Sequence, residues 1–257
     1  MLPPYPLSRY LFIAILTTVL FSACTKNSDL SIDKKSTSVS DNATVPDLST
    51  CKIRRIYQDV GGERQNALFT YTNTGKPFSV VYSNNGTGNP NHFFIYDAKN
   101  RMREYQKRYG SFVVELHQYG YNANNQIIKD TLTSKEAGVH YIAIITLEYD
   151  AMGRVIKETI VNTFNDSGPL DPIRRPTYTY DSRGNLAVAW WKSSSYDTRI
   201  NPLRQSPELQ FIHRNYSMNN AAVQAKYNSR GLPLSANPSN DGLFNSGVTY
   251  LIVYDCQ

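Results

Sequence analysis

Short stretches of alternating hydrophobic and polar residues recur along this chain, and six of them end at a tyrosine. In five of the six, a large apolar residue stands two positions before the tyrosine, as Phe94 does before Tyr96. Side chains two apart on a β-strand point to the same face, so each pair predicts a strand with one buried face. The six residues are Tyr71, Tyr96, Tyr121, Tyr149, Tyr180 and Tyr227.

A turn signal follows each of these tyrosines. The next residue can hydrogen-bond the backbone ahead of it and start a type I turn. The residue four positions after the tyrosine is Gly or Asn, which enter the left-handed region with little strain. Together the two positions predict the tip of a β-hairpin. The first position holds Thr72, Asp97, Asn122, Asp150, Asp181 and Asn228, and the second holds Gly75, Asn100, Asn125, Gly153, Gly184 and Gly231.

The spacing of these units predicts an all-β single domain over residues 51–257, built as a twisted antiparallel sheet of repeated hairpins. Successive tyrosines are 25, 25, 28, 31 and 47 residues apart, which fits one hairpin plus a connecting strand per unit. Pro77 and Pro233 lack the backbone N–H that a central strand needs, so their units are expected to lie at sheet edges or to end early. The apolar runs at residues 141–147 and 248–254 predict central strands.

These units resemble the YD repeats of the RHS family, in which a Tyr-Asp pair and a downstream Gly-Arg recur on successive hairpins. The closest copy runs from Tyr149 to Arg154, and the resemblance covers roughly residues 68–234. The chain also resembles bacterial lipoproteins that carry a few degenerate copies of this repeat. Large RHS proteins wind many repeats into a shell, but six copies are expected to be too few to enclose anything.

The N-terminal residues predict export and lipidation. Residues 1–23 combine Arg9, an apolar run and small residues before Cys24, which resembles a lipoprotein signal peptide with Cys24 as the lipidated residue. Phe21 departs from the aliphatic residue usual in that motif, and a secreted protein cut nearby is the alternative. Residues 24–50 are rich in Ser and Thr and predict a flexible tether spanning about 25–30 Å on average, so that the folded part stands off the membrane. A bacterial cell-envelope location, with an outer-membrane anchor facing either side, is expected.

Two further cysteines flank the predicted domain. Cys51 lies at its start and Cys256 lies one residue before the end. Exported proteins meet an oxidising compartment, so a disulfide between the two is expected. Two buried free thiols on terminal strands are the alternative.

Charge and motifs favour a protein without catalytic activity. Without residues 1–23 the chain has 26 basic and 21 acidic side chains, since only Arg9 is removed from the 27 and 21 of the whole sequence, and it has no basic run that predicts nucleic-acid binding. No metal-binding or nucleotide-binding motif is present, so no cofactor is expected. A glycosidase pair could be built from two carboxylates, but any sheet with this many acids offers such pairs. The histidines are His92, His117, His140 and His213, and the candidate carboxylates are Glu115, Glu148 and Glu158.

A possible ligand-binding region follows the fifth turn. Trp190 and Trp191 are adjacent on a predicted strand and must point to opposite faces, so one of them can be exposed to stack on a sugar or a protein partner. Residues 192–208 predict a long loop that includes Tyr196, although a simple crossover explains it equally well. The leading hypothesis is a lipid-anchored, non-enzymatic binding or scaffold protein with a protein or glycan partner. A carbohydrate-binding accessory protein of a glycan-uptake system is the alternative, and a glycosidase is ranked last.

Overall fold

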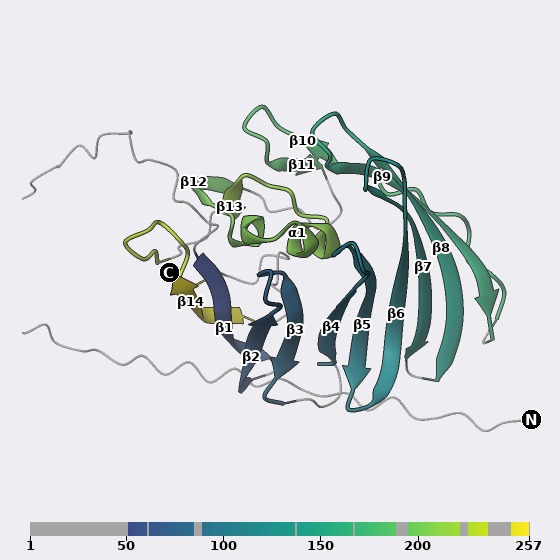
Figure 1. The fold of residues 1–257 in the computed structure, drawn as a ribbon, viewed down its shortest axis with the longest axis horizontal. Coiled ribbons are helices and arrows are strands. Elements are labelled where there is room, and N and C mark those ends of the chain that lie inside the picture. The colour runs from purple at the N-terminus through teal and green to yellow at the C-terminus, as the bar shows by residue number, and fades with distance from the viewer. Residues whose placement is uncertain are drawn as a thin grey trace, which may run out of the picture. The chain divides into compact units, whose positions relative to one another are not determined.

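The computed structural model describes residues 51–256 except residues 61, 85–88, 137, 167, 189–194, 222–225 and 236–247, and these described residues belong to one compact unit. Strands dominate this part of the chain, so the all-β prediction is confirmed. Ten of the strands form one antiparallel sheet in the order β14-β1-β2-β3-β4-β5-β6-β7-β8-β9 (Figure 1). They are β1 (Cys51–Val60), β2 (Glu63–Tyr71), β3 (Pro77–Tyr82), β4 (Asn91–Tyr96), β5 (Met102–Tyr109), β6 (Phe112–Tyr121), β7 (Ile127–Glu136), β8 (Val139–Tyr149), β9 (Val155–Asn165) and β14 (Val248–Cys256).

The sheet is a simple meander from β1 to β9, and the last strand of the chain, β14, is added beside β1. Neighbours from β1 to β9 follow in chain order, whereas β14 pairs with β1 from the far end of the sequence. The prediction of a central strand holds for residues 141–147, which lie in β8 between β7 and β9. It is wrong for residues 248–254, since β14 is the first strand of the sheet. Between residues that the structure describes, one backbone hydrogen bond reaches the outer edge of β14, in which Ile252 N donates to Leu234 O at 2.7 Å.

The six predicted turns are where the chain reverses, and one hydrogen-bond pattern recurs in them. At the second turn Asp97 Oδ1 accepts from the backbone N–H of Lys99 and of Arg101, both at 2.9 Å. The left-handed residue of this turn is Asn100, at φ 57°. Positive φ occurs at the equivalent position of every unit, namely Gly75, Asn125, Gly153, Gly184 and Gly231.

Pro77 does not mark a sheet edge, because β3 lies between β2 and β4. The residue begins its strand opposite Tyr71, at a register shift where the ladder does not need its N–H. Its carbonyl accepts a hydrogen bond from Tyr96 OH at 2.7 Å. Pro233 pairs with Tyr227 only through an isolated bridge, so that last unit is short.

A ladder of tyrosine hydroxyls links most units to the one before it, the exception being Tyr227, whose hydroxyl donates to Asp197 Oδ2. Tyr96 OH donates to Pro77 O, which lies six residues after Tyr71, the tyrosine of the preceding unit. The same six-residue offset recurs in the later bonds, and Tyr254 returns the ladder to β14 beside β1. The bonds run from Tyr71 to Ile53 O (2.6 Å), Tyr121 to Met102 O (2.7 Å), Tyr149 to Ile127 O (2.6 Å), Tyr180 to Val155 O (3.2 Å), Tyr196 to Leu186 O (3.0 Å) and Tyr254 to Pro233 O (2.8 Å).

Residues 192–208 do not form the long loop that was expected. From residue 196 onward they contain β12 (Tyr196–Ile200), the short 3-10 helix η2 (Pro202–Gln205) and the start of α1 (Pro207–His213). Ser206 caps α1 by accepting from Leu209 N, and Pro207 occupies the first helical position, where a missing N–H costs nothing. A helix of seven residues carries too little periodicity to stand out in a sequence. The remaining strands are β10 (Thr179–Tyr180), β11 (Leu186–Val188) and β13 (Asn219–Ala221).

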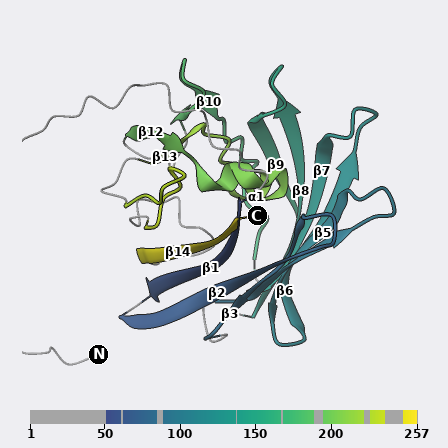
Figure 2. The ribbon, with the colours of Figure 1, turned by 60° about the vertical axis from the view of Figure 1, so that its left-hand side comes forward.

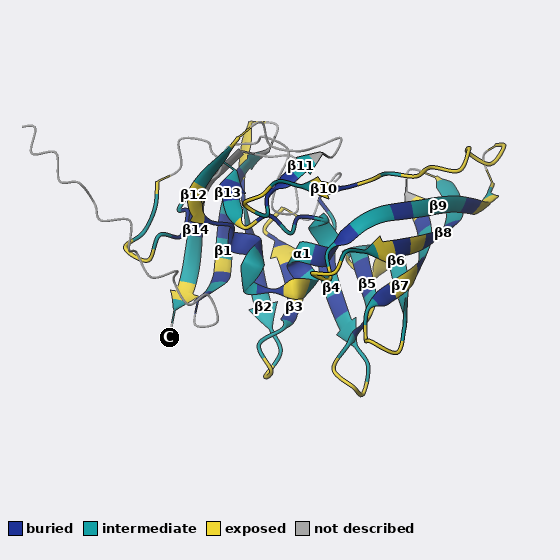
Figure 3. Cartoon of the chain, turned by 90° about the horizontal axis from the view of Figure 1, so that it is seen from above, coloured by how far each residue is buried: buried dark blue, intermediate teal, exposed yellow. Residues whose placement is uncertain are grey.

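Helix α1 lies on the concave side of the curved sheet (Figures 1 and 2). Leu203, Leu209 and Phe211 are buried in the same cluster as inward-facing strand residues such as Phe69 and Phe94. Buried positions alternate with more exposed ones along the strands, as the colouring of Figure 3 shows. Ladder tyrosines pack against the same cluster, among them Tyr71, Tyr96, Tyr121, Tyr149, Tyr180, Tyr196 and Tyr254.

Polar contacts fix this helical segment at three points. Gln205 Oε1 accepts from Ile53 N at 2.7 Å, and Lys76 Nζ lies 2.9 Å from Glu208 Oε1. At the other end Arg214 Nε donates to Glu158 Oε1 at 2.7 Å. The segment is thereby tied to β1, to the first turn and to β9, and it acts as the inner support of the sheet.

The strain that a side chain causes at a left-handed turn position can be tested at Gly153. Gly153→Ala is expected to lower the free energy of unfolding by about 1 kcal/mol, because φ is 77° and a Cβ there has open space around it, so backbone strain is the only cost. Urea denaturation would measure the difference. Gly168→Ala is the control, since its Cβ also meets open space but its φ is not in the left-handed range. Equal stability of the two variants would contradict the expectation.

Candidate functional site

A chain of charged side chains crosses the inner face of the sheet on β5, β6 and β7. Lys107 Nζ lies 2.7 Å from Glu115 Oε1, and that oxygen lies 3.1 Å from His117 Nε2. His117 Nδ1 is 2.8 Å from Asp130 Oδ2. The strand register brings these residues together, since Lys107 pairs with Glu115 and His117 lies two positions along the same strand. Two cations therefore alternate with two carboxylates.

The charges in this chain hold one another in the ionised state. Burial by itself lowers the pKa of His117, but its hydrogen bonds to Asp130 and Glu115 outweigh this and raise the pKa to about 9. Burial raises the pKa of Glu115, but hydrogen bonds and charges from His117 and Lys107 reverse the effect and lower it to about 2. Both ring nitrogens of His117 are thus engaged by carboxylates. The imidazolium has no lone pair left to bind a metal or to act as a general base.

Two other histidines flank this chain in the neutral form. A hydrogen bond joins His92 Nδ1 to the hydroxyl of Tyr105 on the neighbouring strand. Burial, followed by the charge of Lys107, lowers the pKa of His92 to about 3. Burial and Lys107 likewise lower the pKa of His213, at the end of α1, to about 4. His92 is 4% exposed and lies near the start of β4.

These histidines make stability depend on pH in both directions. His117 has a folded-state pKa above its ordinary value of 6.5, so its contribution to stability is complete below pH 6.5 and is lost as the pH rises towards 9. His92 and His213 have folded-state pKa values below 6.5, so stability falls as the pH drops from 6.5 towards 4. Maximum stability near pH 6.5 is expected from urea denaturation between pH 4 and 9. In His117→Gln the loss of stability above pH 6.5 should disappear, while the loss below pH 6.5 remains. If the variant still loses stability above pH 6.5 as the wild type does, groups other than His117 cause that loss.

A shallow depression of about 430 Å³ lies beside the turn between β8 and β9. Its lining combines side chains of β8, β9 and the approach to β10, including Glu148, Lys157, Thr177, Thr179 and Tyr180. The charged groups are paired within it, since Lys157 Nζ lies 2.5 Å from Glu148 Oε1. Asp150 and Arg154 also line it, so hydroxyl groups, two carboxylates, an ammonium and a guanidinium are available to hydrogen-bond a polar ligand.

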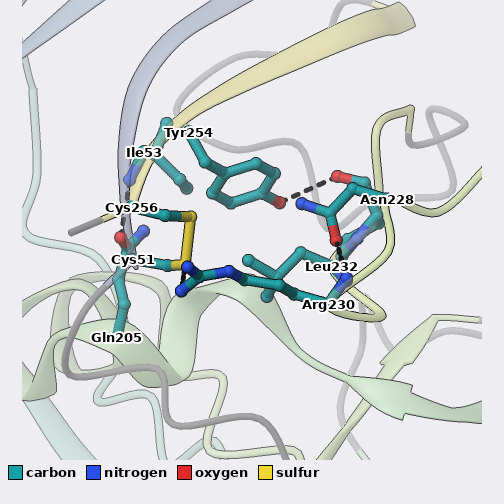
Figure 4. Close-up of a disulfide and its surroundings, with 9 residues drawn as sticks. Cys51, Ile53, Gln205, Asn228, Arg230, Leu232, Tyr254 and Cys256 are labelled. Atoms are coloured by element: carbon teal, nitrogen blue, oxygen red, sulfur yellow. Dashed lines mark hydrogen bonds between the residues drawn. A yellow bond between two sulfur atoms is a disulfide. The ribbon is translucent and has the colours of Figure 1, made fainter.

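Cys51 and Cys256 form a disulfide where β1 meets β14 (Figure 4). Cys51 is 2% exposed, and its sulfur accepts a hydrogen bond from Arg230 Nη1 at 3.4 Å. Arg230 belongs to the sixth turn, in which Asn228 Oδ1 accepts from its backbone N–H at 3.0 Å. The ladder bond from Tyr254 to Pro233 lies beside the same disulfide. The first strand, the last strand and the last turn therefore meet at one point.

The three candidate glycosidase carboxylates do not converge. Glu115 belongs to the inner charged chain described above, and Glu148 pairs with Lys157 at the outer depression. Glu158 is buried, where it accepts from Tyr178 OH at 2.7 Å as well as from Arg214. Each is committed to a different structural contact.

The remaining predicted site residues are placed as follows. Tyr196 packs partly buried against the core, and its hydroxyl is part of the ladder. His140 lies on β8 with its ring 5.1 Å from that of Phe164. Cys24, Trp190 and Trp191 lie outside the described residues.

The structural roles of some residues were not predicted from the sequence. Tyr196 and Tyr254 occupy ladder positions although no turn of the repeated type follows them. A signal for them was present, because both stand in Tyr-Asp pairs like those of the turns at Tyr96 and Tyr149. The buried pair of Arg214 and Glu158 had no such signal, since its partners are 56 residues apart.

Comparisons with known proteins add no assignment: no protein-family model matches the chain, and no curated protein matches it. Among the helices of the described residues, none has the length and apolar character that crossing a bilayer requires. The described ranges also contain no cluster of three or more His, Cys, Asp or Glu side chains suited to a metal ion.

Proposed function

We propose that this chain is a lipid-anchored protein of the bacterial cell envelope with a binding or scaffold role and no catalytic activity. The observation that carries the proposal is the disulfide between Cys51 and Cys256. Such bonds persist in oxidising compartments and are rare in the bacterial cytosol. A structural disulfide therefore supports the export that residues 1–23 and Cys24 predict.

The inner charged chain supports a structural role over a catalytic one. A general base needs a free lone pair near the substrate, and both nitrogens of His117 are held by carboxylates. Glu115 and Glu158 each have a cationic partner at 2.7 Å, Lys107 and Arg214 respectively. A rigid sheet with internally satisfied charges is instead suited to present loops and turns to a partner. The tyrosine ladder also supports kinship with the YD-repeat lipoproteins, as part of the same proposal.

The anchor can be tested in bacteria grown with an alkyne-bearing fatty acid. Wild-type protein is expected to incorporate the label and to fractionate with membranes, whereas Cys24→Ser should lose both properties. Cys256→Ser serves as the matched control, because it removes another cysteine without touching the predicted lipidation site. Unlabelled wild-type protein in the soluble fraction would overturn the anchor. Protease treatment of intact cells would then separate periplasmic from surface-facing anchoring.

Carbohydrate binding is the second candidate, and the depression beside β8 and β9 favours it. Its exposed hydroxyl and carboxylate groups, at Thr177, Thr179 and Glu148, are of the kind that hydrogen-bond sugar hydroxyls. The high aromatic content is weaker support, because many tyrosines are used by the ladder. Saturable binding on a glycan array that Thr177→Ala and Glu148→Ala weaken would support this function at the depression. If only Trp190→Ala or Trp191→Ala abolishes binding, the glycan binds at a site other than the depression. If no glycan on the array binds, a protein partner is favoured.

A further inference from the structure

We propose that the bond between Cys51 and Cys256 is a site of directed thiol–disulfide exchange, at which an external thiolate attacks the sulfur of Cys256. This goes beyond an anchor or scaffold function, because it assigns a reaction to the disulfide. The reaction partner is defined by its chemistry as a thiol, and a dithiol would carry the exchange to full reduction.

Access decides which sulfur is attacked. Cys51 is 2% exposed and lies beneath the side chain of Arg230, whereas Cys256 is only partly buried. Cys256 also lies near the end of β14, the first strand in the sheet order. An incoming thiolate must approach in line with the bond it breaks, and Cys256 is the less buried of the two residues.

Charge decides which sulfur leaves. Arg230 Nη1 donates to Cys51 Sγ at 3.4 Å, and the guanidinium stays protonated throughout the pH range of interest. A cation beside a sulfur stabilises the thiolate and lowers its pKa, and a thiol of lower pKa leaves faster. The turn at Asn228 holds Arg230 in this place before any reaction occurs. The same contact that shields Cys51 therefore prepares it as the leaving group.

The exchange balances without any further reactant. The thiolate RS⁻ forms a bond to Cys256 Sγ, the bond between the two protein sulfurs breaks, and its electron pair leaves on Cys51 as a thiolate paired with Arg230. The product is a mixed disulfide on Cys256. With a dithiol, the second thiol attacks the mixed disulfide, releases Cys256 as a thiolate and is itself oxidised to a disulfide. With a monothiol, Cys51 can attack the mixed disulfide and restore the original bond.

The state of this bond controls how firmly β14 is held to β1 at one edge of the sheet. Once it is open, β14 is held to β1 by strand pairing and to the last turn by the bond from Tyr254 to Pro233. The other ladder bonds, from Tyr71 to Ile53 O on β1 through to Tyr196 on β12, do not involve β14. Exchange would thus loosen the last strand without dismantling the remaining units.

Reduced glutathione is a suitable probe for the purified mature chain, residues 24–257 with Cys24→Ser. The reaction would be stopped with acid at short times, and peptide mass analysis would locate the glutathione. We expect it on Cys256, and we expect the disulfide of Arg230→Gln to open about fivefold more slowly, because its leaving group has lost the neighbouring cation. Arg230→Lys should restore part of the rate. Arg183→Gln, an exposed arginine at the preceding turn, should leave the rate unchanged.

Two results would overturn the inference. One is glutathione on Cys51, which would mean that access does not follow the burial seen here. The other is an unchanged rate in Arg230→Gln, which would mean that the guanidinium does not assist the leaving sulfur. A circular dichroism spectrum of each variant before the reaction would confirm that altered folding is not the cause of a changed rate. None of these readouts depends on lipidation, so the inference and the proposed anchor fail separately.

Discussion

Replacing Cys51 and Cys256 together by alanine is expected to lower the free energy of unfolding by about 5 kcal/mol in the chain-entropy account. The two cysteines are separated by 205 residues, so the bond removes a large amount of conformational freedom from the unfolded chain. The native contacts of β14 with β1 remain, and the variant should still fold. Guanidinium denaturation of the oxidised wild type and the double variant would measure the difference.

A reduced wild-type sample provides the matched comparison. With the disulfide opened and the thiols blocked, the native protein should lose about as much stability as the alanine variant, since both remove the same covalent constraint. Cys24→Ser should have no effect, because that residue is outside the pair. If the double alanine variant keeps the full stability of the oxidised protein, the attachment of β14 must depend on strand pairing and the ladder instead.

Replacing Arg214 by methionine is expected to cost about 3–5 kcal/mol, because it leaves the carboxylate of Glu158 buried without its cation. The two side chains are 13% and 7% exposed, and their atoms are 2.7 Å apart. Their contact attaches the end of α1 to β9, so its loss also weakens the inner support of the sheet. Thermal and urea unfolding would both report the change.

An exposed ion pair between β8 and β9 offers a control for this experiment. Lys157 and Glu148 also lie 2.5 Å apart, but their side chains are 37% and 59% exposed. Lys157→Met should therefore cost less than about 1 kcal/mol, as exposed ion pairs usually do. Replacing both partners of the buried pair, as Arg214→Met with Glu158→Leu, should recover much of the lost stability. If Arg214→Met and Lys157→Met lower the free energy of unfolding equally, the buried ion pair does not stabilise the protein more than the exposed one.

The places where this chain reverses could be predicted because they are encoded locally. An acceptor at one position and Gly or Asn three residues later define the bend by themselves, as at Asp150 and Gly153. The partner of each tyrosine hydroxyl could not be predicted in the same way. That partner is a carbonyl of the preceding unit, and its position depends on how neighbouring strands align.

The contacts of the inner charged chain also could not be predicted from the sequence. His117 and Asp130 are 13 residues apart and meet only because β6 and β7 pair in one particular register. Helix α1 was missed for a different reason, since its seven residues are held by tertiary contacts and end caps more than by their own periodicity. The edge position of β14 depends on pairing with β1 across the whole chain, and no local pattern carries that information.

The pairing of the first and last strands also decides where this unit can be joined to others. The Cα atoms of Cys51 and Cys256 are 4.0 Å apart, so the polypeptide enters and leaves the sheet at nearly the same place. A reporter domain appended after Gln257 would therefore start beside Cys51. A reporter domain inserted at Gly110, at the tip between β5 and β6, would instead be attached to a solvent-facing hairpin.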